Sequence, residues 1–583
     1  MILNSRRPLL HPLSRFNNKI LSTTRRLSYN NPIWKFQSTL NDLTAELAQH
    51  QPKYSISADG IRILSQPSEF YSALLNMIRS AEERIFLSSL YIGSSESELI
   101  STLRQRLTEK ESLQLYVHLD FNRSTRPDPS STANILLPLL RAFPDRVHVS
   151  LFRSPSLRGI MARIVPPRFN EGWGTWHAKI YGVDDDVIIS GANLNKDYFT
   201  NRRDRYIQFA AQPRLSDYCF NFLQTITPFS YRLLPSNAAA AAGDENPHSE
   251  TRGDYTLVWS DPETHPHHIG EDIGHALASF QSTHRSKLEE ESLQIAQCPP
   301  NHPTVTIFPL IQAGQFNIRE EERFFQFLFG HLKKAAMRPM LPKVGSLPQV
   351  VSSVVHERPR MDMTSGYFSL YKPYQKLMLL HPQVEVRIVA ASPKANGFFG
   401  SQGISGRIPE GYTYMEQKFM KAVRRTAKRF SYFGAGQTNI ELGEWFKDGW
   451  TYHAKGLWLS PSKDSPPVLS LFGSTNLNSR SADIDTELSF VMILPPVQPT
   501  IPFNAEADSV VDSTSISTTP NGARHATTIQ NLSTPENGSV ERLYGQLEQE
   551  VTGIREDVGP WQGGTRKVRW LTKVMVWLVG GKL

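Results

Sequence analysis

Two segments of the chain repeat the same spacing of a histidine and a lysine. The first reads Thr-Trp-His-Ala-Lys and carries His177 and Lys179, and the second reads Thr-Tyr-His-Ala-Lys and carries His453 and Lys455. Residues two apart on a strand point to the same face, so each segment would present an imidazole beside an ammonium group. This pairing favours phosphoryl transfer, which needs a titratable nucleophile, a second imidazole to protonate the leaving oxygen, and cations where negative charge accumulates. The chemistry requires no metal ion and no cofactor.

A turn of sequence Asn-Leu-Asn follows each of these pairs. The candidate substrate-binding side chains in and beside the two turns are Asn193, Asn195, Ser474, Asn476 and Asn478. Their amide and hydroxyl groups could donate hydrogen bonds to phosphate oxygens, and turn formation or helix capping is the alternative role for each. Farther along the chain, Glu487 could bind substrate or orient one of the imidazole rings.

The segments that carry these motifs lie within two series of alternating helices and strands. In residues 54–235 the apolar spacing predicts strands at 84–91, 113–119 and 147–152 with helices between them, and residues 298–494 repeat that order. A run of small and polar residues from 236 to 248 marks a boundary, and we expect residues 236–297 to form a linker with connecting helices. The pattern predicts two α/β lobes related by a pseudo-twofold axis, with the active site at their interface.

The pattern His-x-Lys-x4-Asp followed by a Gly/Ser-x-Asn turn resembles the signature of the phospholipase D superfamily. The first copy includes Asp184, whereas the second has Ser460 at that place. The resemblance implies two in-line displacements through a phosphohistidine, in which the catalytic residues are His177, Lys179, Asp184, His453 and Lys455. We expect His177 to be the nucleophile and His453 the general acid and base, because only the first copy has the aspartate. The reverse assignment is the alternative.

Within that superfamily the chain resembles the mitochondrial phosphatidylglycerophosphate synthase family. The likeness extends over most of residues 54–494 and includes FLSSLYIG at 86–93, LDFNRSTR at 119–126 and YHAKGLWL at 452–459. It implies transfer of the phosphatidyl group from CDP-diacylglycerol to glycerol 3-phosphate, with release of CMP, in phosphatidylglycerol and cardiolipin synthesis. The phosphate of the acceptor needs further cations, and a solvated surface is the alternative role for the candidates, which are Arg123 and Arg126 and a second cluster of Arg202, Arg203 and Arg205.

The net charge of +8 lies at the two ends of the chain. Residues 1–41 contain seven basic residues and no acidic one, and residues 566–583 contain five more, which leaves 51 basic against 55 acidic residues between them. A nucleic-acid-binding protein usually has a basic excess in its folded part, so we expect no nucleic acid partner. The rival hypotheses are a superfamily phosphodiesterase that acts on nucleic acid, a phosphatidyltransferase with another acceptor, and an inactive scaffold that binds anionic lipid.

The two ends of the chain also predict a location. The acid-free segment 1–41 is typical of a mitochondrial transit peptide, a disordered basic tail being the alternative. No run approaches the ~20 apolar residues that a spanning helix requires. Residues 495–539 are of low complexity, and we expect disorder there. Residues 540–583 are expected to be helical, and their cations beside Trp570 and Trp577 favour peripheral attachment to anionic lipid on the matrix side of the inner membrane; a last core helix is the alternative.

Two further groups of residues favour structural roles. With Cys219 and Cys298 as its only cysteines, the chain cannot form a disulfide scaffold or a multi-cysteine metal site, and we expect Cys219 in the core. The histidines of the run 265–268 lack the helical spacing and the fourth ligand of a zinc site, so we expect a loop there.

Overall fold

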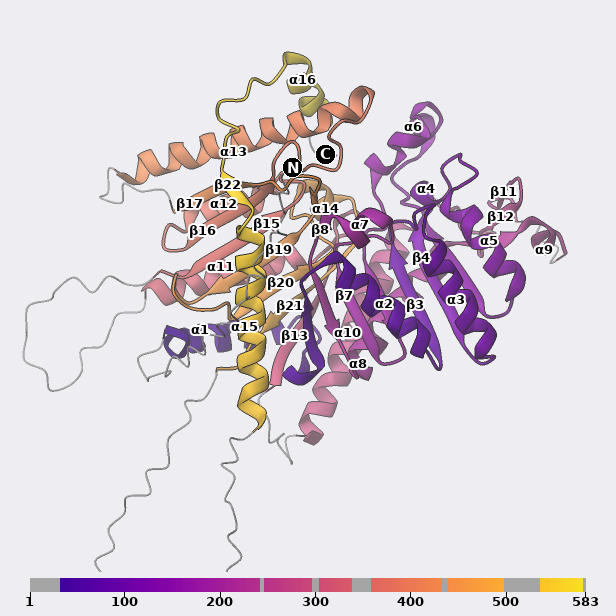
Figure 1. Ribbon diagram of the computed structural model, residues 1–583, viewed down its shortest axis with the longest axis horizontal. Helices are drawn as coiled ribbons and strands as arrows, with labels where there is room; N and C mark the ends of the chain where they lie inside the picture. Colours follow the sequence, from indigo (N-terminus) through magenta and orange to yellow (C-terminus); the bar gives the residue numbers. More distant parts are fainter. Residues whose placement is uncertain are drawn as a thin grey trace, which may run out of the picture.

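The computed structural model describes residues 32–241, 246–295, 304–337, 358–431, 439–496 and 535–579. Two large mixed sheets flanked by helices form the two halves of the molecule (Figure 1). Most of the expected transit peptide, Cys298, most of the expected low-complexity segment and the last four residues lie outside the described ranges.

The first sheet has 10 strands in the order β11-β12-β10-β5-β4-β3-β6-β7-β9-β2. Its parallel centre consists of β3 (Arg84–Ser89), β4 (Gln114–Asp120) and β5 (Val147–Phe152). The remaining strands are β2 (Ile61–Leu64), β6 (Ile180–Val183), β7 (Asp186–Ser190), β9 (Tyr206–Phe209), β10 (Tyr231–Pro235), β11 (Glu250–Arg252) and β12 (Tyr255–Val258). The main helices of this lobe are α2 (Pro67–Ser80), α3 (Ser97–Glu109), α5 (Thr132–Ala142) and α8 (Pro213–Ile226). Parallel strands covered by helices are buried on both faces, which accounts for their nearly continuous apolar runs.

The second sheet also has 10 strands, in the order β1-β13-β21-β20-β19-β15-β16-β17-β22, with β14 (Ile318–Arg319) paired to β13 beside this path. Its strands include β13 (Thr304–Ala313), β15 (Arg360–Ser365), β16 (Glu385–Ala391), β17 (Ile440–Trp445), β19 (Lys455–Ser460), β20 (Leu469–Gly473) and β21 (Glu487–Ile493). The main helices are α11 (Glu320–Met337), α12 (Lys372–Leu380) and α13 (Ile408–Ser431).

The two sheets share one topology. The order β2-β9-β7-β6-β3-β4-β5 of the first sheet matches β13-β21-β20-β19-β15-β16-β17 of the second, strand for strand. The directions also match, because β3 and β15 are each parallel to the next two strands on one side and antiparallel to the motif strand on the other. The predicted pair of α/β lobes is confirmed.

The boundaries of the lobes differ from those expected from composition. Strand β1 (Tyr54–Ser57), expected in the first lobe, pairs with β13 of the second. Strands β11 and β12 extend the first sheet where a linker was expected, and β22 (Val558–Pro560) pairs with β17 of the second sheet where only helix was expected. Helix α1 (Pro32–Ala48) begins inside residues 1–41, the expected transit peptide, and buries Leu40 and Leu43. Edge strands this short depend on partners far away in the sequence, so local patterns do not reveal them.

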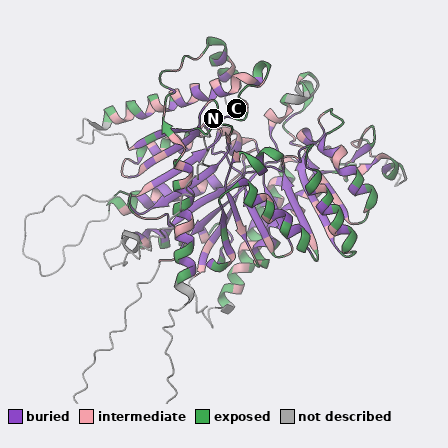
Figure 2. Ribbon diagram, in the orientation of Figure 1, coloured by how far each residue is buried: buried purple, intermediate pink, exposed green. Residues whose placement is uncertain are grey.

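The two lobes share one hydrophobic core. Buried apolar side chains of both lobes form a connected cluster, in which Phe209 of β9 stacks on Phe472 of β20 with ring centroids 6.1 Å apart. The buried residues fill the sheets, whereas the exposed ones lie on the outer faces of the helices (Figure 2). Helix α15 (Pro535–Arg555) adds a polar link, because Glu550 accepts hydrogen bonds both from Arg205 of the first lobe at 2.8 and 2.9 Å and from Trp458 of the second at 2.8 Å. The lobes are therefore fixed relative to each other.

Candidate active site

Each motif histidine is held in place by main-chain hydrogen bonds to the opposite lobe. The His177 N–H donates to the carbonyl oxygen of Thr486 at 2.9 Å, and the Thr486 N–H donates back to Thr175 at 2.9 Å. In the other copy, β18 (Thr451–Tyr452) pairs in parallel with β8 (Arg202–Arg203), and the His453 N–H donates to the Arg203 carbonyl oxygen at 2.8 Å. Both histidines therefore lie at the lobe interface, as expected.

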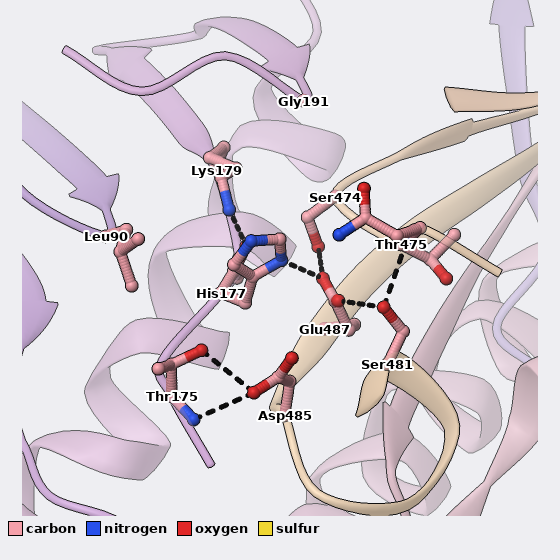
Figure 3. A network of polar contacts seen from close by, with 12 residues as sticks. Leu90, Thr175, His177, Lys179, Gly191, Ser474, Thr475, Ser481, Asp485 and Glu487 are labelled. Atoms are coloured by element: carbon pink, nitrogen blue, oxygen red, sulfur yellow. Dashed lines mark hydrogen bonds and ion pairs between the residues drawn. The ribbon is translucent and has the colours of Figure 1, made fainter. Parts of the chain in front are cut away.

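A carboxylate from the opposite lobe also holds each imidazole ring. His177 Nδ1 donates to Glu487 Oε2 at 2.8 Å (Figure 3), and His453 Nδ1 donates to Asp204 Oδ2 at 2.7 Å. Because an ionised carboxylate only accepts, the proton of each neutral ring is placed on Nδ1, and Nε2 is left with the lone pair that a nucleophile or base requires. The pairing of carboxylate and ring is thus crossed between the lobes.

Asp204 is a functional residue that reasoning from the motifs missed, although its spacing contains the signal. Asp204 stands 11 residues after Asn193, and Glu487 stands 11 residues after Asn476. Extending the internal repeat by 11 residues beyond Asn193 and Asn476 would have found both carboxylates together. The expected ring-orienting role of Glu487 agrees with its contact to His177.

The carboxylate that holds His177 also accepts hydrogen bonds from two serine hydroxyls. Glu487 is fully buried and accepts from Ser474 Oγ and, at 2.6 Å, from Ser481 Oγ as well as from the imidazole (Figure 3). Burial raises the pKa of Glu487, but His177, Lys179 and the Ser474 hydrogen bond outweigh burial and lower its pKa to about 2. Glu487 is therefore ionised at neutral pH. The hydroxyl of Ser474, a predicted substrate-binding residue, donates a hydrogen bond to this carboxylate.

The two lysines are buried and contact their neighbouring histidines in different ways. Lys179 Nζ donates to the His177 carbonyl oxygen at 2.7 Å, whereas Lys455 Nζ lies 2.6 Å from His453 Nδ1 and 3.4 Å from Asp204 Oδ2. Burial lowers the pKa of Lys179 to about 7 and also lowers the pKa of Lys455. A bound phosphate would add negative charge beside both ammonium groups and so offset the cost of burying them.

The four motif side chains belong to one electrostatic cluster. Lys179 interacts with Lys455 and with both carboxylates, Glu487 and Asp204, and Lys455 interacts with the same two carboxylates. Burial lowers the pKa of His177, and burial followed by the charge of Lys455 lowers that of His453 well below its usual value. Neutral imidazoles beside cations are the arrangement that nucleophilic attack on a phosphate ester needs.

Asp184 does not lie with these residues. Its carboxylate accepts from the main-chain N–H groups of Glu82, Glu83 and Arg84 at 2.8 to 2.9 Å, and its backbone adopts a left-handed φ of 48°. It ends strand β6 five residues beyond Lys179, roughly 16 Å along an extended chain. Asp184 therefore fastens the β6–β7 turn to the start of β3. The expectation that Asp184 assists catalysis is not supported by its position. Because the motif aspartate does not contact the imidazoles, the serine at the equivalent position 460 does not deprive the second lobe of a catalytic group.

The asparagines of the two turns divide into capping and internal residues. Asn195 Oδ1 accepts from the Asp197 N–H at 3.0 Å and caps α7 (Lys196–Thr200), and Asn478 Oδ1 accepts from the Ser481 N–H at 2.9 Å and caps α14 (Ser479–Asp483). Asn193 Nδ2 donates to the Tyr198 hydroxyl at 3.1 Å. For Asn195 and Asn478 the capping alternative describes the observed contacts.

In the second arginine cluster, Arg202 is the residue whose side-chain charge acts on a motif histidine, His453. The Arg203 side chain donates a hydrogen bond to the Ser65 carbonyl oxygen, and the Arg205 side chain forms an ion pair with Glu550. Arg202 lies over the ring of Tyr198 at 4.5 Å, and the Tyr198 hydroxyl is 3.4 Å from His453 Nε2.

Arg123 and Arg126 are held near the carboxyl end of β4. Both form ion pairs with Glu171, and Arg123 also packs over the ring of Tyr91 at 4.3 Å. Their side chains keep 27% and 29% of their exposure, so a ligand could reach them. Arg123 interacts electrostatically with Tyr198, which places it toward the His453 side of the site.

The remaining residues singled out from the sequence are structural. His265 lies in a loop with ring centroids 4.7 Å from His267 and 5.5 Å from His268. Cys219 is fully buried on α8, and burial raises the pKa of its thiol. Within the described ranges no helix is both long and apolar enough to cross a membrane.

Comparison with known proteins gives relatives for most of the chain. It is 33% identical over 457 residues to the CDP-diacylglycerol–glycerol-3-phosphate 3-phosphatidyltransferase of Schizosaccharomyces pombe, covering 76% of this chain and 86% of that protein. The mitochondrial protein of the same name from Homo sapiens is 33% identical over 457 residues, covering 76% of this chain and 75% of the human one.

The fold also has a counterpart among solved structures. Phosphatidylserine synthase from Haemophilus influenzae superposes with a TM-score of 0.56 at 17% identity, covering 94% of this chain and 98% of that one, which shows a shared fold. No protein-family model matches the chain.

Proposed function

We propose an activity from one premise: this chain belongs to the CDP-diacylglycerol–glycerol-3-phosphate 3-phosphatidyltransferase family. It transfers the phosphatidyl group of CDP-diacylglycerol to glycerol 3-phosphate and forms phosphatidylglycerophosphate and CMP. The observation that carries the proposal is the pair of buried imidazoles, each held on Nδ1 by a carboxylate of the opposite lobe. Two such rings beside two lysines supply a nucleophile, an acid and base, and the cations for a double displacement at phosphorus.

In the first displacement, His177 Nε2 attacks the phosphatidyl phosphorus. A nitrogen–phosphorus bond forms, and the bond from that phosphorus to the bridging oxygen of the diphosphate breaks. The negative charge of the bound diphosphate lets His453 take up a proton on Nε2, and CMP leaves with that proton. Lys179 and Lys455 offset the charge that accumulates on the phosphoryl oxygens. In the second displacement, His453 takes a proton from a hydroxyl group of glycerol 3-phosphate, whose oxygen attacks the phosphorus. The nitrogen–phosphorus bond breaks and His177 is regenerated.

The assignment of His177 as the nucleophile is supported by the two carboxylates. A phosphorylated imidazole that keeps its Nδ1 proton carries a positive charge, which the adjacent carboxylate stabilises. Asp204 already forms an ion pair with Lys455 at 3.4 Å, whereas Glu487 contacts serine hydroxyls and the His177 ring. The charge of Glu487 is therefore more available to a phosphohistidine.

The decisive test is an assay with purified protein, CDP-diacylglycerol and labelled glycerol 3-phosphate. We expect CMP release that depends on the acceptor, and label in the lipid product. Release of CMP at the same rate without acceptor would make the protein a hydrolase, and no release at all would favour the scaffold hypothesis. Serine and phosphatidylglycerol as competing acceptors test acceptor identity, and a single-stranded DNA substrate, which we expect to remain uncleaved, tests the nucleic-acid rival.

The chain is mitochondrial, like its named mitochondrial relatives, and we propose that it binds the matrix side of the inner membrane peripherally. Helix α16 (Trp570–Val579) exposes an apolar set of side chains with basic residues beside it, and α6 (Gly159–Ile164) and the segment 399–404 expose others. The exposed residues are Ile160, Ile164, Phe399, Ile404, Trp570, Leu571, Val574, Trp577 and Leu578. In Figure 1, α16 lies at the top of the molecule and α6 projects at its upper right. Exposed tryptophans beside cations are typical of an interfacial helix.

Vesicle sedimentation tests this attachment. Replacing Trp570 and Trp577 with alanine should release most of the protein from vesicles that contain phosphatidylglycerol. Leu293→Ala, which removes an equally exposed apolar side chain from α10 (Gly270–Ile295), is the matched control and should remain bound. Equal binding of both variants would contradict the proposal.

A further inference from the structure

A cavity at the carboxyl ends of the parallel strands of the first lobe has no part in the steps described so far. It has a volume of about 650 Å³ and lies beside α4 (Phe121–Ser124), which begins directly after β4; we name it the α4 cavity. Open α/β sheets bind their ligands in crevices at the carboxyl ends of the strands. The volume falls within the range of small-molecule sites, about 300–1,000 Å³, and is large for a glycerol phosphate alone.

Three arginines line the α4 cavity. Arg126 forms an ion pair with Glu171 and Arg252 one with Glu250, whereas Arg153 lies over the Phe121 ring at 5.0 Å, with Arg252 over the same ring at 5.4 Å. Two carboxylates, Asp128 and Asp254, also line the cavity. Guanidinium groups bind phosphate oxygens with paired N–H donors, so this wall suits a phosphate ester. Tyr255 and Phe121 supply flat apolar surface on the same cavity.

The cavity is also lined by residues with unused hydrogen-bonding atoms. Among the described residues, Asn122 Nδ2, Asn170 Oδ1 and Arg153 Nε are buried and have no hydrogen-bond partner. Asn122 is only 7% exposed, and a buried polar group without a partner is unfavourable unless a ligand or water satisfies it. An amide donor and an amide acceptor match the cytosine edge, which has carbonyl and ring-nitrogen acceptors beside an amino donor.

A short path connects the α4 cavity to the reaction centre. Asp120 Oδ1 caps α4 by accepting from the Arg123 N–H at 2.8 Å, and its Oδ2 accepts from the N–H of Trp176, the residue before His177, at 3.0 Å. Strand β4 is two places from the motif strand β6 in the sheet, about 10 Å. A nucleotide whose diphosphate passes Arg123 could therefore reach the cavity while its outer phosphorus lies at the imidazoles.

From these observations we propose that the α4 cavity holds the cytidine monophosphate portion of the phosphatidyl donor, which leaves as CMP. The inference rests on the proposed transferase activity and adds the position of the leaving group. The phosphate of CMP lies against Arg126, Arg153 and Arg252. The cytosine forms hydrogen bonds with Asn122 Nδ2 and Asn170 Oδ1. The diacylglycerol portion then extends toward the second lobe.

The test is the binding of CMP to the full chain by titration calorimetry. Arg153→Gln and Arg252→Gln should each raise the dissociation constant by about tenfold or more, because each removes a charge-assisted contact to phosphate. Asn122→Leu, which replaces the orphan amide with an apolar side chain of similar size, should reduce the preference for CMP over UMP. Arg104→Gln, with the same charge change on the exposed face of α3, is the control and should bind CMP like the parent chain. Unfolding temperatures identify any variant that fails to fold, and Arg153→Lys then serves as the conservative replacement.

The outcomes separate this inference from the activity on which it rests. If the parent chain transfers phosphatidyl groups but all variants bind CMP equally, the α4 cavity is not the nucleotide site. If the arginine variants instead lose glycerol 3-phosphate binding and keep CMP, the cavity belongs to the acceptor and the inference is overturned. A donor with p-nitrophenol in place of CMP gives a second readout: Arg153→Gln should slow transfer from CDP-diacylglycerol and spare transfer from the p-nitrophenyl ester. Absence of any transfer by the parent chain would overturn the proposed activity itself.

Discussion

The two lobes of this protein match in backbone and differ in the side chains around their motifs. Each lobe presents its His-Ala-Lys segment where a corresponding strand begins, β6 or β19, and each holds the histidine of the other through a main-chain hydrogen bond and a carboxylate. In the first lobe the carboxyl ends of the parallel strands lead into a cavity lined by arginine and asparagine, whereas the second lobe has Tyr367, Phe398 and Tyr412 packed at the corresponding end.

The residues that carry out the reaction are repeated in both lobes, whereas those that would bind the substrates are not. Features present twice, the ring and its crossed carboxylate, are those that any double displacement at phosphorus requires. Features present once, the cavity lined by arginine and asparagine and the aromatic surface, would have to recognise the two dissimilar ends of a liponucleotide. Substitutions in each set of residues should therefore affect different steps.

The largest effect is expected from the imidazoles themselves. His177→Ala and His453→Ala should each reduce transfer by roughly 10³-fold or more, since each removes a group that makes or breaks a bond. Brief reaction with labelled CDP-diacylglycerol should leave covalent phosphatidyl label on the His453→Ala protein and none on the His177→Ala protein. The reverse labelling would exchange the roles of the two lobes, and His275→Ala, an exposed histidine on α10, should retain full activity.

The crossed carboxylates come next. Glu487→Gln and Asp204→Asn should lower kcat by roughly 10²- to 10⁴-fold, because each amide can hold the ring in the wrong tautomer without changing the fold. If each imidazole acts in a different step, Glu487→Gln should slow formation of the covalent intermediate. Asp204→Asn should slow transfer of the phosphatidyl group to the acceptor, and single-turnover kinetics measure both rates. Ser481→Ala, which removes one hydrogen bond to Glu487, should have a smaller effect in the same direction as Glu487→Gln.

Lys179 connects the active site to stability. Its pKa falls to about 7 in the folded protein from the ordinary value of 10.5, chiefly through burial, so the unfolded chain binds more protons between these two pH values. Stability should therefore rise with pH across this window, and below about pH 7 the full cost of burying the charge should be present. Lys179→Met should stabilise the protein by a few kcal/mol near pH 6 and by progressively less toward pH 10, while transfer is lost. Urea denaturation at several pH values measures this, and a pH-independent difference would contradict it.

The smallest effect on chemistry is expected at Asp184. Asp184→Asn weakens main-chain hydrogen bonds at the β6–β7 turn and should lower stability by about 1–2 kcal/mol. The transfer rate at a temperature where the variant is folded should remain within a factor of a few of the parent. A loss as large as that of the carboxylate variants would return Asp184 to the catalytic set, and Ser460→Asp in the second lobe provides the converse substitution.

The parts of the fold and site that could be predicted from the sequence are those written into local spacing. The spacing of apolar residues predicts the parallel strands, and the repeated His-Ala-Lys segment predicts two imidazoles that face each other. Asp184 was expected near the imidazoles because it follows Lys179 by five residues in the motif. Strand β6 lies between the two residues and places Asp184 at its far end. Arg205 looked like a phosphate ligand, but its partner Glu550 is 345 residues away in a helix that no local pattern links to it. Strand β1 likewise depends on a partner in the opposite lobe.

The exchange of main-chain and carboxylate contacts between the lobes has a consequence for the protein before folding is complete. A newly imported chain whose halves have formed but not yet docked would have both rings unsupported and free to turn. It would therefore be unable to cleave an activated lipid with water. The site is complete only when the halves have joined, so the fold and the catalytic arrangement are acquired together.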